Sequence, residues 1–281
     1  MVYLITGATG NIGSRVVDRL LAGGERPRVF ARDPEKARAR FGGRVDVVAG
    51  DLADAASLAR ALSGVDALFL VNSGPGLEAR DEAAAKVAKA SGVKRLVKLS
   101  SFDAEPRVGT GEWHAKGEAS IVATGLPFVF VRPTGFMDNA LFWARGIQAE
   151  GVVRSSTGSG KIPFIHSDDI ADVATKALTT REHDGQVLPI TGPEALSYAD
   201  MTEKIGAAIA RPLRYERITD EETGHHFARI EPPAMVKAHL SIFRAIREGR
   251  LEAVTDSIER VLGRRPFTFD RWVEQNAGAF R

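Results

Sequence analysis

The sequence predicts an α/β fold in which a doubly wound parallel sheet is followed by a smaller, mainly helical cap. The first 191 residues alternate short β-branched runs with longer stretches whose apolar residues recur near a 3.6-residue spacing. That alternation is typical of parallel βαβ units. A glycine-rich turn joins the first run to the first helical stretch, and helical patterns predominate after residue 191.

Seven strands and the helices between them make up the expected sheet domain. The strands are Val2–Thr6, Arg28–Ala31, Asp46–Ala49, Ala67–Val71, Leu96–Ser100, Phe128–Arg132 and Val187–Ile190. The helices between them include Ile12–Ala22 and Glu78–Ser91. Such a Rossmann-like sheet binds its ligands beyond the C-terminal ends of the strands.

The rest of the chain is expected to cover these strand ends rather than to fold alone. In this prediction residues 1–191 form the sheet domain, and residues 192–281 form a helical cap over the substrate, helped by residues from about 134 to 160. The predicted cap helices are Met201–Ala210, Met235–Glu248, Thr255–Leu262 and Phe269–Ala277. Prolines between these stretches end them, because proline cannot continue a helix.

The composition excludes several classes of function. Of 281 residues, 44% are apolar and 26% are charged, which is ordinary for a globular protein. The net charge of +2 gives no field that would favour nucleic acid or an anionic membrane. Without cysteine there is no thiolate nucleophile or sulfur-ligated metal, and the pair His225 and His226 lacks further ligands nearby. We expect no metal site.

The N-terminus and the hydropathy pattern bear on location. The first ten residues lack the basic region and long apolar core of a signal peptide. No apolar stretch approaches the roughly 20 residues of a membrane span. We therefore expect a cytoplasmic protein, present as a monomer or homodimer.

The glycine-rich turn predicts a dinucleotide site. Gly7 permits a sharp turn after the first strand, Gly10 lets the backbone approach a pyrophosphate, and Gly13 allows helix and strand to pack closely. The following helix directs its free N–H groups at the phosphates. The residues expected to bind the cofactor here are Thr6, Gly7, Thr9, Gly10, Asn11, Ile12 and Gly13.

The end of the second strand indicates which dinucleotide binds. An NAD site has an acidic residue there, which accepts a hydrogen bond from the ribose 2′-hydroxyl. This chain has Arg32 instead, whose guanidinium suits a 2′-phosphate, and Lys36 adds a second positive charge. Asp33 precedes Pro34 and is expected to cap the next helix. Unless Arg32 is a surface residue without a ligand, the cofactor is NADP(H).

Further cofactor contacts are expected after the third, fourth and fifth strands. The residues after the third strand would border the adenine, and those after the fourth the pyrophosphate or ribose. Ser101 follows the fifth strand and is the hydroxyl expected to reach an acceptor carbonyl, although serines also end strands by forming turns. The remaining candidates are Asp51, Leu52, Val71, Asn72, Ser73 and Ser100.

Several segments of the chain resemble one family of reductases. They are TGATGNIG, FARDPEKA, GDLAD, KLSSF and HAKGEASIVATGLPFVFVRPTGFMDN. Together they resemble the NmrA-like branch of the atypical short-chain dehydrogenase/reductases, over nearly the whole chain. The ending, VTDSIERVLGRRPFTFDRWVEQNAGAF, is similar to bacterial relatives grouped with quinone oxidoreductases and ergot-alkaloid reductases. The resemblance implies that Lys116 binds the nicotinamide ribose and acts in catalysis, the alternative being an exposed lysine on the solvated face of its helix.

The chain departs from the wider superfamily at the proton donor. Many such reductases protonate their substrate with a tyrosine four residues before the lysine, but Glu112 stands there. Tyr3, Tyr198 and Tyr215 are the only tyrosines, and none has a lysine four residues on. This predicts a reductase restricted to acceptors whose product anion is already stabilised.

A proton, where one is needed, would come from water, Ser101 or His114. His114 lies two residues from Lys116 and thus on another helical face. We expect its imidazole to face solvent or a local partner.

The predicted enzyme is an NADPH-dependent reductase of a hydrophobic conjugated acceptor in secondary metabolism. The acceptor would be an aromatic ketone, a quinone or an iminium. Aromatic residues after the sixth strand are core by default, but some could line an apolar pocket. The residues expected to contact the substrate are Phe102, Phe136, Met137, Asn139 and Trp143. The alternative is a redox sensor that binds NADP(H) without turnover, which the missing tyrosine favours.

Overall fold

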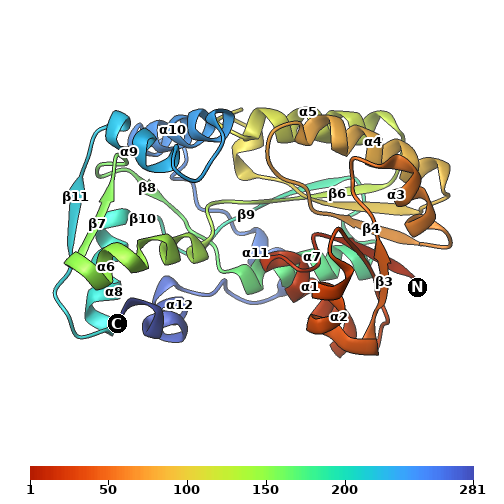
Figure 1. The fold of residues 1–281 in the computed structure, drawn as a ribbon, viewed down its shortest axis with the longest axis horizontal. Coiled ribbons are helices and arrows are strands. Elements are labelled where there is room, and N and C mark those ends of the chain that lie inside the picture. Colours follow the sequence, from red (N-terminus) through yellow and green to blue (C-terminus); the bar gives the residue numbers. More distant parts are fainter.

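The computed structural model describes all 281 residues and has two parts, a sheet domain and a cap (Figure 1). The central sheet has seven parallel strands in the order β3-β2-β1-β4-β5-β6-β9. Their bounds are β1 Tyr3–Thr6, β2 Arg28–Ala31, β3 Asp46–Ala49, β4 Ala67–Leu70, β5 Arg95–Leu99, β6 Phe128–Pro133 and β9 Gln186–Ile190. All seven predicted strands are confirmed, with ends that differ by at most one residue. The strand order reverses between β1 and β4, and ligands bind at such a reversal.

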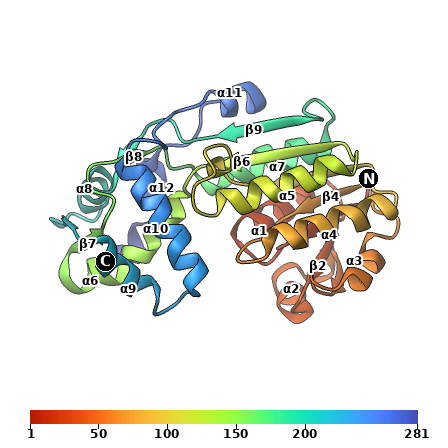
Figure 2. The same ribbon diagram turned by 90° about the horizontal axis from the view of Figure 1, so that it is seen from above.

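Helices cover both faces of this sheet (Figures 1 and 2). They are α1 Asn11–Ala22, α2 Pro34–Phe41, α3 Ala55–Leu62, α4 Leu77–Ala90, α5 Gly111–Ala123 and α7 Ser167–Thr179. Side chains alternate across a strand, so Ile5 packs with α1 and α7 while Leu4 packs with α3 and α4. Both are fully buried, and each such side chain contributes about 1.5–3 kcal/mol.

Two of the helix starts follow from their capping residues. The Asp33 carboxylate accepts a hydrogen bond from the backbone N–H of Lys36 at 3.0 Å, and Pro34 is the first helical residue of α2. The predicted capping role of Asp33 is confirmed. Asp54 caps α3 in the same way through the backbone N–H groups of residues 56 and 57. The carboxylate of Asp33, the residue after Arg32, is therefore occupied in capping α2.

The cap lies beside the C-terminal strand ends and is mainly helical (Figure 2). Its helices are η3 Met137–Trp143, α6 Ala144–Glu150, α8 Tyr198–Ala208, α9 Asp220–Phe227, α10 Pro233–Arg247 and α12 Phe269–Asn276. It also contains short strands, β7 Val152–Ser155 with β11 Arg214–Arg217, and β8 Lys161–Ile162 with β10 Leu196–Ser197. These four strands were not expected.

One predicted cap helix packs with the sheet domain instead. α11, Ser257–Leu262, lies against α7 and β9. Ile258 and Val261 join the same core as α1 and α7. The chain therefore returns to the sheet before α12 re-enters the cap. No helix is both long and apolar enough to cross a membrane.

Candidate functional site

The glycine turn forms one wall of a cavity at the strand ends. The cavity has a volume of about 270 Å³. Its other walls come from the ends of β4 and β5, from His114 of α5, and from Phe136 after β6. The residues that line it and that the sequence predicted are Gly7, Gly10, Asn11, Ile12, Gly13, Val71, Asn72, Ser73, Ser100 and Phe136.

The turn requires glycine at two positions. Gly7 has φ of +60°, and a Cβ there would contact the Val71 side chain at 2.9 Å. A Cβ on Gly13 would overlap the carbonyl oxygen of Gly7. Backbone is therefore exposed where a pyrophosphate would lie, and helix α1 begins directly behind it. This cradle fits a dinucleotide.

The family of the chain follows from comparison with known proteins. Residues 7–181 match the model of a family described as NAD(P)H-binding. The chain belongs to this NAD(P)H-binding family. The match covers the sheet domain from the glycine turn to the end of α7.

Relatives of this NAD(P)H-binding protein are similar along its full length. One is the (4-alkanoyl-5-oxo-2,5-dihydrofuran-3-yl)methyl phosphate reductase of Streptomyces griseus, 37% identical over 99% of both chains. Another is the NAD(P)H azoreductase of Xenophilus azovorans, 35% identical over 99% of both chains. The Escherichia coli quinone oxidoreductase QOR2, solved with NADPH, has the same fold with a TM-score of 0.88 at 23% identity, over 98% of this chain and 99% of that one.

These findings confirm the resemblance drawn from the motifs. The protein is an NAD(P)H-dependent oxidoreductase of the NmrA-like, atypical short-chain dehydrogenase/reductase type, and its cofactor is a nicotinamide dinucleotide, NAD(P)H. Its motifs at Gly7–Gly13 and at the end of β2 lie within the matched family region.

Two cationic side chains lie free at the end of β2. Arg32 and Lys36 are exposed. The neighbouring Arg38 is paired with Glu35, and Arg40 is paired with Asp18 at 2.8 Å. Arg32 and Lys36 are therefore the cations of this segment that remain available for a 2′-phosphate.

Several predicted cofactor residues are engaged within the protein. The Thr6 hydroxyl accepts a hydrogen bond from the backbone N–H of Val71 at 2.7 Å, which ties β1 to β4. The Asn72 amide donates to Asp81 at 3.0 Å and accepts from Arg80 at 2.9 Å. Asp51 accepts from the N–H of residue 53, and Leu52 packs on the core beneath β3. These side chains shape the site, while their backbones border it.

Asn11 connects the glycine turn to the cap. Its amide donates to Ser167 at 2.9 Å and to Asp138 at 3.2 Å. Asp138 also accepts hydrogen bonds from Ser167 and, at 3.2 Å, from the indole N–H of Trp272 in α12. The sequence analysis missed Asp138, because its partners lie more than 100 residues away along the chain, except Ser167.

The two serines after β5 have different surroundings. The Ser100 hydroxyl is buried and donates to Glu118 at 2.6 Å, and Glu118 is paired with Arg132. Ser101 is half-buried and hydrogen-bonds Asp103, whose pKa is raised to about 6 by burial against the opposing effect of that bond. Ser101 therefore keeps a hydroxyl with an acidic neighbour, which the sequence analysis did not include.

The lysine given by the resemblance lies outside the cavity. Lys116 and Glu112 form an ion pair at 2.8 Å with 57% and 53% of their side chains exposed. The buried face of α5 instead carries Gly111, His114 and Glu118. At about 100° per residue, Glu112 and Lys116 lie on the opposite side of the helix. The structure does not bring Lys116 to the glycine turn.

The side chain of His114 points toward the cavity, an orientation that the sequence analysis did not predict. Its side chain is 9% exposed and lines the cavity, so the expectation that it faces solvent or a local partner is wrong. Its Nδ1 atom is buried without a hydrogen-bond partner. The spacing of buried α5 residues, at 111, 114, 118 and 121, could have shown this orientation.

The predicted substrate residues divide into three groups. Phe136 lines the cavity, and Asn139 is exposed nearby in η3. Phe102 and Trp143 are half-buried against the cap core. Met137 is only 1% exposed and belongs to that core, and its contact with substrate stays a prediction. The 3₁₀ period places residues 137, 140 and 143 inward.

Phe142 is an exposed aromatic residue of the same helix. The aromatic residues after the sixth strand were expected to be core by default or to line an apolar pocket, but the side chain of Phe142 is 81% exposed. It lies between the inward positions 140 and 143 of η3, so the same three-residue period turns it outward. An exposed aromatic side chain is therefore available on the segment that follows β6.

The three tyrosines lie away from a proton-donor position. Tyr3 is buried in β1, and Tyr198 is buried in the aromatic core of the cap, where burial raises the pKa of its phenol. Tyr215 donates a hydrogen bond to the backbone carbonyl of Ser155 at 3.0 Å within the cap. None of them lines the cavity.

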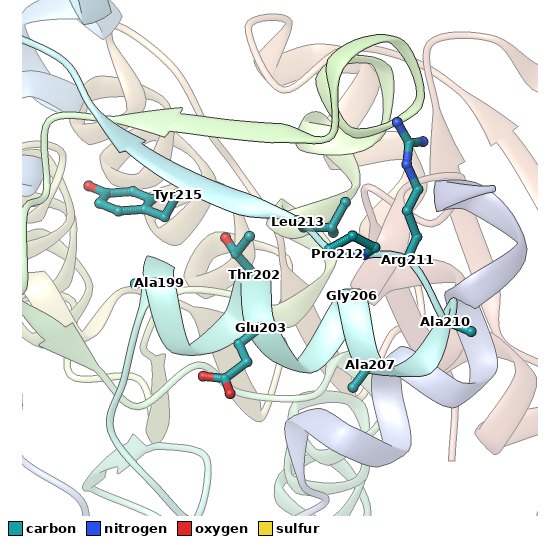
Figure 3. Close-up of a pocket in the computed structure, with 10 residues that line it drawn as sticks. All are labelled: Ala199, Thr202, Glu203, Gly206, Ala207, Ala210, Arg211, Pro212, Leu213 and Tyr215. Carbon is teal, nitrogen blue, oxygen red and sulfur yellow. The ribbon is translucent and has the colours of Figure 1, made fainter.

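Another hollow, of about 640 Å³, lies in the cap between α8 and β11 (Figure 3). It is far from the glycine turn (Figure 1). Two of its polar side chains are engaged, since the Thr202 hydroxyl donates to the carbonyl of Tyr198 and Arg211 donates to that of Gln148. We assign it no role in the chemistry.

Proposed function

We propose that this oxidoreductase reduces hydrophobic, conjugated acceptors with NADPH and without a tyrosine proton donor. One observation carries the proposal: the cavity beside the glycine turn contains no tyrosine, and all three tyrosines of the chain are held elsewhere. An acceptor that needs no strong acid at the moment of hydride transfer fits such a site.

The bound cofactor supplies a hydride at its nicotinamide ring. The chain supplies the geometry for that transfer. The glycine turn holds the pyrophosphate against α1, and Phe136 gives an apolar surface beside the cavity. Positioning alone contributes a large part of the rate in such a transfer. A quinone or conjugated carbonyl spreads the resulting charge over several atoms, so water or the Ser101 hydroxyl suffices as proton source.

The relatives support this class of acceptor. The two full-length relatives are a reductase of an alkanoyl-oxo-dihydrofuranyl methyl phosphate and an azoreductase, and the structural neighbour is a quinone oxidoreductase. Each of these acceptors carries a conjugated π-system. The aromatic residues of the cap, among them Trp143, Tyr198 and Phe243, pack on one another and give the cap an apolar interior.

The test compares acceptors at a fixed NADPH concentration. Oxidation of NADPH is followed with benzoquinones, azo dyes and acyl-substituted unsaturated lactones, and with unconjugated aliphatic ketones of the same size. We expect kcat/KM at least about 100-fold higher for the conjugated group, because an unstabilised alkoxide requires a positioned acid, which supplies typically that factor or more. Equal rates with aliphatic ketones would contradict the proposal, as would tight NADPH binding without turnover of any acceptor.

A further inference from the structure

His114 is the one histidine in the cavity wall, and its polar atoms are not satisfied by the protein. The side chain is 9% exposed. Its Nδ1 atom is buried and has no hydrogen-bond partner. Leaving a buried polar group unpaired is costly, and no hydrogen bond within the protein holds this imidazole, which leaves it available to a ligand group in the cavity that it lines.

The charged groups around His114 are already paired with one another. Lys98 of β5 and Asp81 of α4 form an ion pair at 2.6 Å, and both side chains are fully buried. Arg132 of β6 is paired with Glu118 of α5. No neighbouring carboxylate is therefore free to bind the imidazole.

The same surroundings fix its charge. Burial lowers the pKa of His114 well below its usual value, and the positive charges of Lys98 and Arg132 lower it further. The imidazole is thus neutral at physiological pH and offers one N–H donor and one nitrogen acceptor. It is suited to hold a hydroxyl or an amide, and it is a poor proton donor.

The position of His114 indicates which half of the cofactor it meets. Arg32, the candidate for the 2′-phosphate, follows β2 on one side of β1, while β4, β5 and β6 lie on the other side. His114 lines the cavity together with Ser100 at the end of β5 and Phe136 after β6. A dinucleotide lying across the reversal of strand order places its nicotinamide half there.

We propose that His114 is a positioning residue that hydrogen-bonds the nicotinamide riboside of bound NADPH and so orients the ring for hydride transfer. In this role it takes the place that the family resemblance gives to Lys116, which lies outside the cavity in an exposed ion pair. The inference depends on the cofactor and is independent of the identity of the acceptor.

The test uses two ligands that differ only in the nicotinamide half. Affinities for NADPH and for adenosine 2′,5′-bisphosphate, which lacks the nicotinamide riboside, are measured by calorimetry. We expect His114→Phe to weaken NADPH binding by roughly three- to tenfold, the effect of one hydrogen bond, and to leave binding of the bisphosphate within about twofold. The acceptor turnover kcat should fall more than KM rises, because orientation of the ring is lost.

Three further variants make the comparison decisive. His225→Phe changes an exposed histidine in the cap and should alter neither affinity. Lys116→Met tests the competing assignment and should leave the preference for NADPH over the bisphosphate unchanged. If His114→Phe is poorly folded by its melting temperature, His114→Gln retains a donor and an acceptor and should keep NADPH affinity near that of the wild type.

Two results would overturn the inference. One is an equal loss of affinity for NADPH and for the bisphosphate in His114→Phe, with a melting temperature equal to that of the wild type. The other is a selective loss of NADPH in Lys116→Met but not in His114→Phe. Because both of these results rest on ligand affinities and melting temperature and not on acceptor turnover, a failure here is separate from a failure of the proposed acceptor class.

Discussion

The cofactor side and the cap are stabilised in different ways. Beneath the cavity, polar side chains pair with one another in full burial, as Lys98 does with Asp81 and Ser100 with Glu118. The cap core is aromatic instead, with Tyr198 in contact with Trp143, Phe164 and Phe243. Directional pairs fix positions, whereas aromatic packing tolerates differences in shape. Under the proposed function, the first side would hold the cofactor and the second would border an apolar acceptor.

The largest effect is expected where a buried pair of the cofactor side is broken. Asp81→Asn leaves the fully buried Lys98 without its counter-charge, and we expect the free energy of unfolding to fall by about 3–5 kcal/mol. Glu82→Gln is the matched control on the same helix, because Glu82 is paired with Lys86 at the surface, and it should cost less than about 1 kcal/mol. Similar losses in urea unfolding of both variants would show that burial of the pair does not matter.

The second effect is on cofactor preference and should leave the stability of the cap unchanged. Arg32→Glu replaces the exposed cation at the end of β2 by an acid. We expect NADPH to lose its advantage over NADH, by about 1.5–3 kcal/mol for each charged hydrogen bond that is lost. Calorimetry with both cofactors measures this change. Equal affinities of the wild-type protein for NADPH and NADH would contradict the assignment of Arg32.

The third change tests the cap separately. Trp143→Ala removes an aromatic ring that is half-buried against Tyr198, at 4.8 Å between ring centroids. If this ring borders the acceptor, kcat/KM should fall by about 1–3 kcal/mol in activation free energy while NADPH affinity stays within about twofold. The adjacent Phe142→Ala, at an exposed position, is its control. A joint loss of melting temperature, NADPH affinity and turnover would place Trp143 in the core alone.

The two regions also differ in how far the sequence predicts them. The sheet strands and the Asp33 cap follow from local patterns, because alternation and capping act over a few residues. The pairing of β7 with β11 joins residues about 60 positions apart, and no local pattern records it. The orientations of His114, Met137 and Phe142 depended on helical period, which the sequence contains. The lack of a hydrogen-bond partner for Nδ1 of His114 depends on which side chains of other elements surround it, so only the structure reveals it.

The loop between β5 and α5 joins the two regions. The smallest expected effect is the pH-dependent contribution of its residue Asp103 to stability. Asp103 is half-buried after β5, and Gly109 of the same loop lies against α10 of the cap. Burial raises the pKa of Asp103 to about 6. Between pH 4 and 6 the folded state therefore binds more protons at this site than the unfolded state does.

The sign of the resulting pH dependence follows from that difference. The contribution of Asp103 to stability falls as pH rises from about 4 to about 6 and stays low above it. Asp103→Asn removes this loss, so the variant should gain stability relative to the wild type between pH 4 and pH 7, as measured by urea unfolding at both values. Glu105→Gln, at an exposed acid of the same loop, is the control. A difference between Asp103→Asn and the wild type that stays constant with pH would mean that the carboxyl is solvated, and that the loop joins sheet and cap less tightly than its packing on α10 implies.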